Sequence, residues 1–210
     1  IQIPLRILSC LNPVKMTKRQ NSPGRSRVVD SPKEKGSRVA AQTSEGYLDQ
    51  ILVKCVPLAV INDLAEKASG DKKLFSHLAT LSLKPPHTRA AKASWALSKA
   101  AALVPAMIVP WQEKILEAIP DAPTGGIKRE LLKSILYSSL HKQGSGRLFD
   151  VCLSLLDPRE DKGVVHYAMD HLERMVKYHP DLKDELAGSV RLFRSKSPGN
   201  LPYRIRVFRY

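Results

Sequence analysis

The feature that most constrains the fold is a helical pattern that returns at a nearly fixed interval. Residues 88–97 (TRAAKASWAL) align with 127–136 (IKRELLKSIL) and 163–172 (GVVHYAMDHL) at offsets of 39 and 36 residues. The alignment forms two rows, Ala93 with Leu132 and Ala168, and Leu97 with Leu136 and Leu172. A second amphipathic helix follows each segment, so the unit is a helical hairpin. One hairpin cannot bury its apolar face alone, so we predict an all-α fold, an α-solenoid of stacked hairpins in a right-handed superhelix.

Proline, glycine and aspartate mark where the predicted helices begin and end. Pro57 stands in the first turn of a helix that Gly70 closes, and Asp71 is a good N-cap for the next helix, which Pro85-Pro86 ends. The helices are predicted over 57–69, 72–83, 88–103, 110–119, 127–140, 147–156, 164–179 and 180–193. Only 203–210 (YRIRVFRY) alternates in the manner of a strand.

The net charge of +14 suggests a nucleic-acid-binding protein until its distribution is considered. Residues 1–46 hold nine basic and three acidic residues, and 194–210 hold five basic residues and no acid. The stretch between them, 47–193, holds 20 basic and 17 acidic residues. Most of the positive charge therefore lies in the flanks. We expect a disordered basic N-terminal segment, a nearly neutral folded domain and a basic C-terminal tail, also disordered, in these three ranges.

The N-terminal flank has the composition of a chain that does not fold. Residues 16–46 are rich in Ser, Pro, Gly, Lys and Arg and poor in bulky apolar residues. The chain begins with Ile1 and its first methionine is Met16, so we expect 1–15 to lie upstream of the natural start or the chain to be a fragment. A weaker alternative makes 7–10 (ILSC) a lipoprotein cleavage box. No apolar run is long enough for a transmembrane helix, and we expect a cytoplasmic location and no membrane partner.

The body also resembles a known family. Residues 71–95 (DKKLFSHLATLSLKPPHTRAAKASW) and 104–119 (VPAMIVPWQEKILEAI) resemble the small HEAT-like repeat proteins of Bacteroidetes-type bacteria. In that group a helix ends in Leu or Phe, and the next helix carries an Arg-Ala-Ala run and a Trp before a Pro-rich turn. Here these are Arg89-Ala90-Ala91 and Trp95, and the three residues between Ala91 and Trp95 depart slightly from the family's spacing. The resemblance implies HEAT-like hairpins over 47–193 and, as in the wider HEAT class, a binding scaffold.

Two tryptophans, Trp95 and Trp111, are candidate aromatic contacts. One interpretation places them in the helix core, because Trp95 stands among small and apolar residues at helical spacing. The other makes them a stacking platform on a concave face, as in HEAT-like DNA glycosylases that act on alkylated bases. Such an enzyme also needs a carboxylate beside the aromatic pair, and Glu113 and Asp121 are the nearby acids. The core interpretation is favoured.

Basic residues line one side of two predicted repeat helices. They are Arg89, Lys92 and Lys99 on the first helix and Lys128, Arg129 and Lys133 on the second. If the second helix of each hairpin lines a concave surface, the two stripes form a basic groove. The alternative is that they are solvated helix faces, which the nearly neutral body favours.

A polar cluster around residue 170 is the nearest approach to a metal site. His166 and Asp170 are four residues apart and share a helix face, with His171 beside them. Two ligands do not make a site, and Asp170 with Arg174 is an equally good ion pair. The sequence therefore predicts no metal and no cofactor.

Two glycine-rich segments and two cysteines have structural interpretations. Residues 124–128 (TGGIK) enter a helix but follow no strand, so they indicate a loop between repeats, not a phosphate-binding loop. Residues 144–147 (GSGR) predict a hairpin turn. Cys55 and Cys152 lie in apolar runs, so we expect buried, inert thiols.

Two classes of function follow from these observations. The first is a noncatalytic scaffold that binds a protein or peptide on its concave face. The second is nucleic-acid binding through the basic flanks and groove, with a glycosylase for alkylated bases as its enzymatic form. The candidate contact residues are Arg89, Lys92, Trp95, Lys99, Trp111, Lys128, Arg129 and Lys133.

Overall fold

The computed structural model describes residues 46, 48, 51–52, 56–139, 142–199 and 201–209. For residues 142–144 it describes the backbone alone. Contacts divide the chain into two units, Ile1–Arg38 and Val39–Tyr210, and every described residue belongs to the second. The predicted disordered segment therefore lies outside the described residues, apart from Gly46, as do the 7–10 motif and Cys55.

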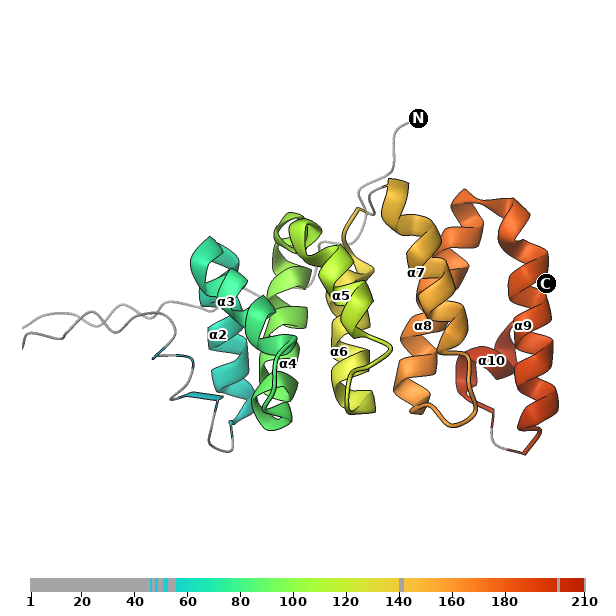
Figure 1. Ribbon diagram of the computed structural model, residues 1–210, viewed down its shortest axis with the longest axis horizontal. Coiled ribbons are helices and arrows are strands. Elements are labelled where there is room, and N and C mark those ends of the chain that lie inside the picture. Colours follow the sequence, from blue (N-terminus) through green and yellow to red (C-terminus); the bar gives the residue numbers. More distant parts are fainter. Residues whose placement is uncertain are drawn as a thin grey trace, which may run out of the picture. The chain divides into compact units, whose positions relative to one another are not determined.

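The described part of the second unit is built from helices, and it contains no strand (Figure 1). Helical residues at 46, 48, 51 and 52 precede the first bounded helix. In chain order the elements are α2 (Leu58–Gly70), α3 (Lys72–Ser82), α4 (His87–Leu103), the 3-10 helix η1 (Pro105–Trp111), α5 (Gln112–Ala118), α6 (Gly125–Leu136), α7 (Lys142–Ser154), α8 (Lys162–Tyr178), the 3-10 helix η2 (Pro180–Leu182), α9 (Lys183–Lys196) and α10 (Tyr203–Val207).

The helices form two layers. In the first, α2, α4, α6 and α8 contact one another in chain order, and we call this the even layer. In the second, the odd layer, α3 contacts η1, η1 contacts α5, and α5 contacts α7. The hairpins α3–α4 and α7–α8 join the two layers, and α10 packs on α8 and α9 at the C-terminal end (Figure 1). This is the stacked-hairpin arrangement that the sequence predicts, and the prediction of an α-solenoid is confirmed.

Short polar side chains start several of the helices. Asp71 accepts hydrogen bonds from the backbone amides of Lys73 and Leu74, so it caps α3 as predicted. Thr124 caps α6 by accepting from the amide of Ile127, and Asp161 caps α8. Thr124 is therefore the N-cap and residues 125–128 are the first turn of α6, so this segment starts a repeat helix and is not the loop that the sequence predicts.

Burial shows the true register of the repeat. With both offsets set to 37 residues, every aligned position below is buried, whereas offsets of 39 and 36 place the partly exposed Leu136 with Leu97 and Leu172. The buried sets are Ala90, Ile127 and Val164; Ser94, Leu131 and Ala168; Leu97, Ser134 and His171; Ser98, Ile135 and Leu172; Ala101, Ser138 and Met175. The offsets of 39 and 36 residues are wrong because serine and histidine occupy core positions in this protein, where apolar residues are expected.

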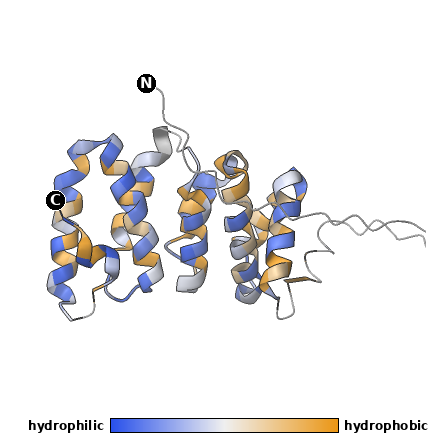
Figure 2. Cartoon of the chain, turned by 180° about the vertical axis from the view of Figure 1, so that it is seen from behind, coloured by the Kyte–Doolittle hydropathy of each residue, from blue (hydrophilic) through white to orange (hydrophobic). Residues whose placement is uncertain are grey.

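The core runs through both layers as one cluster. Its members range from Leu48 and Leu52 ahead of α2 to Ile205 and Phe208 at the C-terminal end. Apolar and polar residues alternate around the described helices, as Figure 2 shows, so each helix can bury one side and solvate the other. The small side chain of Ala93, which is fully buried, allows close packing at α4.

Two other expectations for local structure are wrong. The segment 144–147, predicted as a hairpin turn, lies inside α7, where Gly146 has open space around it. Residues 203–207 form the helix α10 and not a strand, because the apparent alternation is one turn of helix that buries Ile205. Tyr210 lies outside the described residues.

The boundary at 193 also differs from the structure. Residue 193 lies inside α9, which continues to Lys196. The Arg194 guanidinium donates to the carbonyl oxygens of Ile205 and Phe208 at 2.6 and 2.7 Å. Ile205 is fully buried and Phe208 is 8% exposed. In the described residues, the basic C-terminal stretch is therefore a packed part of the domain, because its helix α10 packs against α8 and α9.

Candidate binding surface

Three of the predicted contact residues share one side of α4. Lys92, Trp95 and Lys99 are three and four residues apart, and each is partly exposed. They lie on the side of the helix opposite its most deeply buried residues. On α6, Arg129 stands at the position that corresponds to Lys92 in the 37-residue register, and it is also partly exposed. With Lys133, these residues form a surface across two adjacent helices of the even layer, which we call the α4–α6 face.

Several cations of the α4–α6 face already have partners. The Lys92 ammonium donates to the carbonyl oxygen of Leu52 at 2.9 Å. Arg129 Nε and Lys133 Nζ lie 3.2 and 3.7 Å from the carboxylate of Glu130, whose side chain is 9% exposed. One buried carboxylate thus pairs with two cations. The face has more cations than carboxylates, so its net charge is positive.

The remaining predicted basic residues have different surroundings. Lys128 Nζ lies 2.6 Å from Glu160 Oε1, and its side chain is only 14% exposed. It therefore joins α6 to the turn before α8 and does not stand on the α4–α6 face. Arg89 is partly exposed in the first turn of α4. The structure consequently brings together part of the predicted stripe and assigns Lys128 a structural contact.

The charge of the even layer changes along the stack. Where α4 carries Ala96 and Lys99, the corresponding positions of α8 carry Asp170 and Glu173 in the 37-residue register. Arg204 of α10 contacts both carboxylates, at 2.6 and 2.7 Å. Burial raises the pKa of Glu173 although Arg204 acts in the opposite direction. At these two positions α8 is therefore acidic and does not continue the basic residues of α4.

The two tryptophans differ in their surroundings. Trp95 packs against the core while part of it stays exposed, and the corresponding residues Leu132 and Met169 are fully buried. Trp111 also packs against the core, and it lines a groove of the odd layer. Both indoles are therefore only partly buried, which is less than the sequence interpretation of a core position implies.

The acids do not assemble around either indole as a glycosylase would require. Glu113 pairs with Arg147 at 3.5 Å, and Asp121 lines a different pocket from Trp111. Glu130 lies one hydrogen bond from Ser98 of the helix that carries Trp95, but it is buried and paired with two cations. A carboxylate held in this way is not available as a general base.

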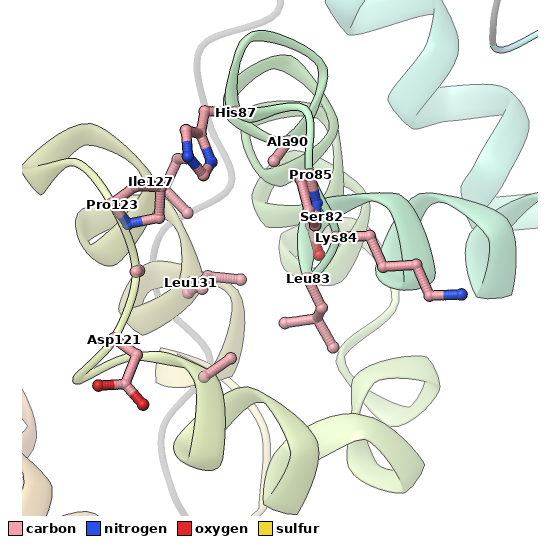
Figure 3. A pocket seen from close by; sticks show the side chains of 12 residues that line it. Ser82, Leu83, Lys84, Pro85, His87, Ala90, Asp121, Pro123, Ile127 and Leu131 are labelled. Carbon is pink, nitrogen blue, oxygen red and sulfur yellow. The ribbon is translucent and has the colours of Figure 1, made fainter.

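A pocket of about 290 Å³ lies where the α3–α4 and α5–α6 turns meet. Figure 3 shows His87 and Asp121 at separate edges of it, with Leu83 and Leu131 directed into the space between. The Ser82 hydroxyl, which also lines it, donates to the carbonyl oxygen of Ala79 at 2.7 Å. The lining is mostly apolar, and no nucleophile–base pair is formed by these residues.

A polar network that the sequence did not reveal holds the C-terminal end of α6. His171 Nε2 donates to the carbonyl oxygen of Leu132 at 2.9 Å, and the Arg174 guanidinium donates to the carbonyl oxygens of Leu136 and Ser138. Burial lowers the pKa of His171 from 6.5 to about 4, so the ring is neutral at pH 7. The signal that could have found it is the 37-residue spacing, which aligns His171 with Leu97 in the core.

The polar residues around residue 170 lie on different sides of α8. His171 points into the core, whereas His166 Nε2 lies 3.5 Å from Asp170 on the exposed side. Asp170 also pairs with Arg204 at 2.6 Å, whereas Arg174, the partner that the sequence predicts, donates to the carbonyl oxygens of Leu136 and Ser138. Among the residues that the structure describes, no three metal-ligating side chains come together. Cys152 is fully buried and burial raises the pKa of its thiol, which agrees with an inert cysteine.

The fold defines a class of protein, an α-solenoid, and its even layer carries the partly exposed basic residues of the α4–α6 face. Residues 48–199 match the HEAT repeat domain family. This match covers most of the chain, and the chain belongs to that family. The comparisons with curated proteins and with solved structures found no match. Within the described residues, no helix is both long and apolar enough to cross a membrane.

Proposed function

We propose that this protein is a noncatalytic HEAT repeat scaffold that binds an acidic segment of a protein partner on the α4–α6 face. The observation that carries the proposal is the grouping of Lys92, Trp95 and Lys99 on one side of α4, next to Arg129 of α6. A partly exposed indole between two ammonium groups offers apolar contact and charge in the same place. Interfaces favour tryptophan and arginine for this reason.

The residues around the face support a protein partner over a nucleic acid. Binding to a phosphate backbone depends on several uncompensated cations along a groove. Here Glu130 offsets part of the charge of Arg129 and Lys133, and α8 continues the layer with Asp170 and Glu173. A short acidic segment fits a basic surface of this limited length. The cytoplasmic location and the Bacteroidetes-type subgroup stay predictions from the sequence.

The class of partner can be tested with two labelled probes. The full chain is titrated by fluorescence anisotropy with a peptide of Glu and Gly and with a DNA duplex, each at two salt concentrations. We expect saturable binding of the peptide. Duplex binding that exceeds peptide binding at both salt concentrations and that disappears when Lys92 and Arg129 are changed to Glu would overturn the proposal in favour of nucleic acid.

A glycosylase is the second candidate, and the contacts of the acids argue against it. Its test is the release of an alkylated base from a duplex by the wild-type chain. The scaffold proposal predicts no release, and release that is lost in the Glu130→Gln variant would establish the enzyme instead.

A further inference from the structure

A second surface lies on the odd layer, away from the α4–α6 face. A groove of about 520 Å³ runs between α3 and η1. Its lining is Lys72, Phe75, Ser76, Ala106, Met107, Pro110, Trp111 and Lys114. We call it the Trp111 groove. It has room for one or two large apolar side chains together with their backbone.

The floor of the groove is apolar and rests on the core. Phe75 is 1% exposed, and Met107 and Trp111 are partly buried against the core cluster. The 3-10 geometry of η1, with about three residues per turn, places Met107 and Pro110 above one another along one wall. A rigid floor of this kind suits an anchoring side chain, because little ordering is needed when it binds.

Positive charge flanks this floor on both sides. Lys72 opens α3 on one wall, and Lys114 of α5 stands at the other, and both side chains are exposed. No carboxylate is among the residues that line the groove. Asp71, next to Lys72, directs its carboxylate to the amides that start α3. The groove therefore combines an apolar floor with two lysines at its edges.

We infer that the Trp111 groove binds a partner segment in which an aromatic or long aliphatic side chain is flanked by carboxylates. The anchor would lie on Phe75 and Met107, and the acids would pair with Lys72 and Lys114. The chain's own N-terminal segment is a poor occupant of this groove, because residues 1–46 carry nine basic and three acidic residues and the groove is flanked by lysines.

The surroundings of Trp111 favour a peptide side chain over a stacked nucleobase. The Lys114 ammonium lies 5.2 Å from the centre of the Trp111 ring, so it already covers one indole face. Base recognition by an aromatic platform needs a free face. Ala106, Met107 and Pro110 add apolar surface that suits an aliphatic or aromatic side chain, and Ser76 adds one hydroxyl to the lining.

The inference is tested with a labelled peptide in which Phe and Leu are flanked by Glu, titrated into the full chain by fluorescence anisotropy. The Lys72→Glu/Lys114→Glu variant should weaken binding roughly tenfold or more, because it reverses both flanking charges. The matched control is Lys73→Glu/Lys177→Glu, which makes the same charge change at exposed residues outside the groove. This control should bind within about twofold of the wild-type chain. Replacing Phe and Leu of the peptide by Ser should also abolish binding.

Other results would overturn the inference. The inference would be contradicted if the groove variant and its control lost affinity for the peptide equally, or if the wild-type chain did not bind the peptide. A dimer in light scattering that the groove variant dissociates would assign the groove to a second copy of the chain. A labelled single-stranded DNA that loses binding only in the groove variant would assign it to nucleic acid. Variants of the α4–α6 face leave this groove intact, so the two proposals can fail separately.

Discussion

The Ser98 hydroxyl of α4 lies 2.6 Å from Glu130 Oε2 of α6, and both residues are buried. The same carboxylate contacts Arg129 and Lys133 of its own helix, and its hydrogen bond with Ser98 joins α6 to α4. Buried charges of this kind are costly when a partner is removed.

We therefore expect Glu130→Ala to lower the free energy of unfolding by about 2 kcal/mol, because a cavity forms and two cations lose their carboxylate. The measurement is urea unfolding followed by circular dichroism. Glu117→Ala is the control, since Glu117 forms an exposed pair with Arg147 and its loss should cost less than about 0.5 kcal/mol. Equal effects of the two variants would contradict this role of Glu130.

The approach of α6 to the N-cap of α8 depends on a glycine. A Cβ at Gly125 would lie 2.6 Å from Asp161 Cβ, closer than atoms can pack. Gly125→Ala should therefore destabilise the protein by about 1–3 kcal/mol. Gly146→Ala, in open space within α7, should stabilise it by up to about 1 kcal/mol through helix propensity. Thermal unfolding of both variants checks the opposite signs, and a stable Gly125→Ala would show that this contact can relax.

The C-terminal helix contributes to stability as a packed element. Deleting residues 200–210 removes the burial of Ile205 and Phe208 and leaves Glu173 without Arg204. The free energy of unfolding should fall by about 3 kcal/mol, given the usual gain from burying such side chains. Arg209→Ala, at an exposed position, serves as the control and should unfold like the wild-type chain. A deletion without effect would restore the sequence expectation of a tail.

Acid should destabilise the protein through His171. Its pKa is 6.5 in a free side chain and about 4 in the folded protein, so the unfolded chain binds the proton first as the pH falls. Stability is therefore lost between about pH 6.5 and pH 4, by about 3 kcal/mol at most. His171→Gln keeps a donor for Leu132 but cannot be protonated. Urea unfolding at pH 7 and pH 4.5 should show a smaller loss in this variant, and an unchanged loss would mean that other groups cause it.

The sequence was sufficient for the fold because the helical period and the caps are local signals. Asp71 caps the predicted helix, and proline and glycine mark boundaries close to the observed ones. The repeat register was harder, since Ser94, Ser98 and His171 are core residues that look polar in a sequence. Local charge patterns also could not foresee partners far along the chain, such as Glu160 for Lys128 or Arg204 for Asp170.

The candidate site also has one part that local sequence spacing predicts and one part that depends on tertiary contacts. Helical spacing predicted that Lys92 and Lys99 share one side of α4. Trp95 was expected in the core, but it lies partly exposed on the same side as these lysines. The Trp111 groove depends on how η1 lies against α3, which is a tertiary contact between two elements of the odd layer. No pattern within either segment predicts the groove.

The binding role of the α4–α6 face is tested most directly by its affinity for the labelled peptide of Glu and Gly. The full chain is compared with Lys92→Glu/Arg129→Glu and with the control Arg191→Glu/Lys196→Glu, which reverses two exposed charges on α9. We expect Kd to rise at least about tenfold in the first variant and to change less than about twofold in the control. Equal Kd values for all three proteins would contradict the claim that this face binds an acidic partner.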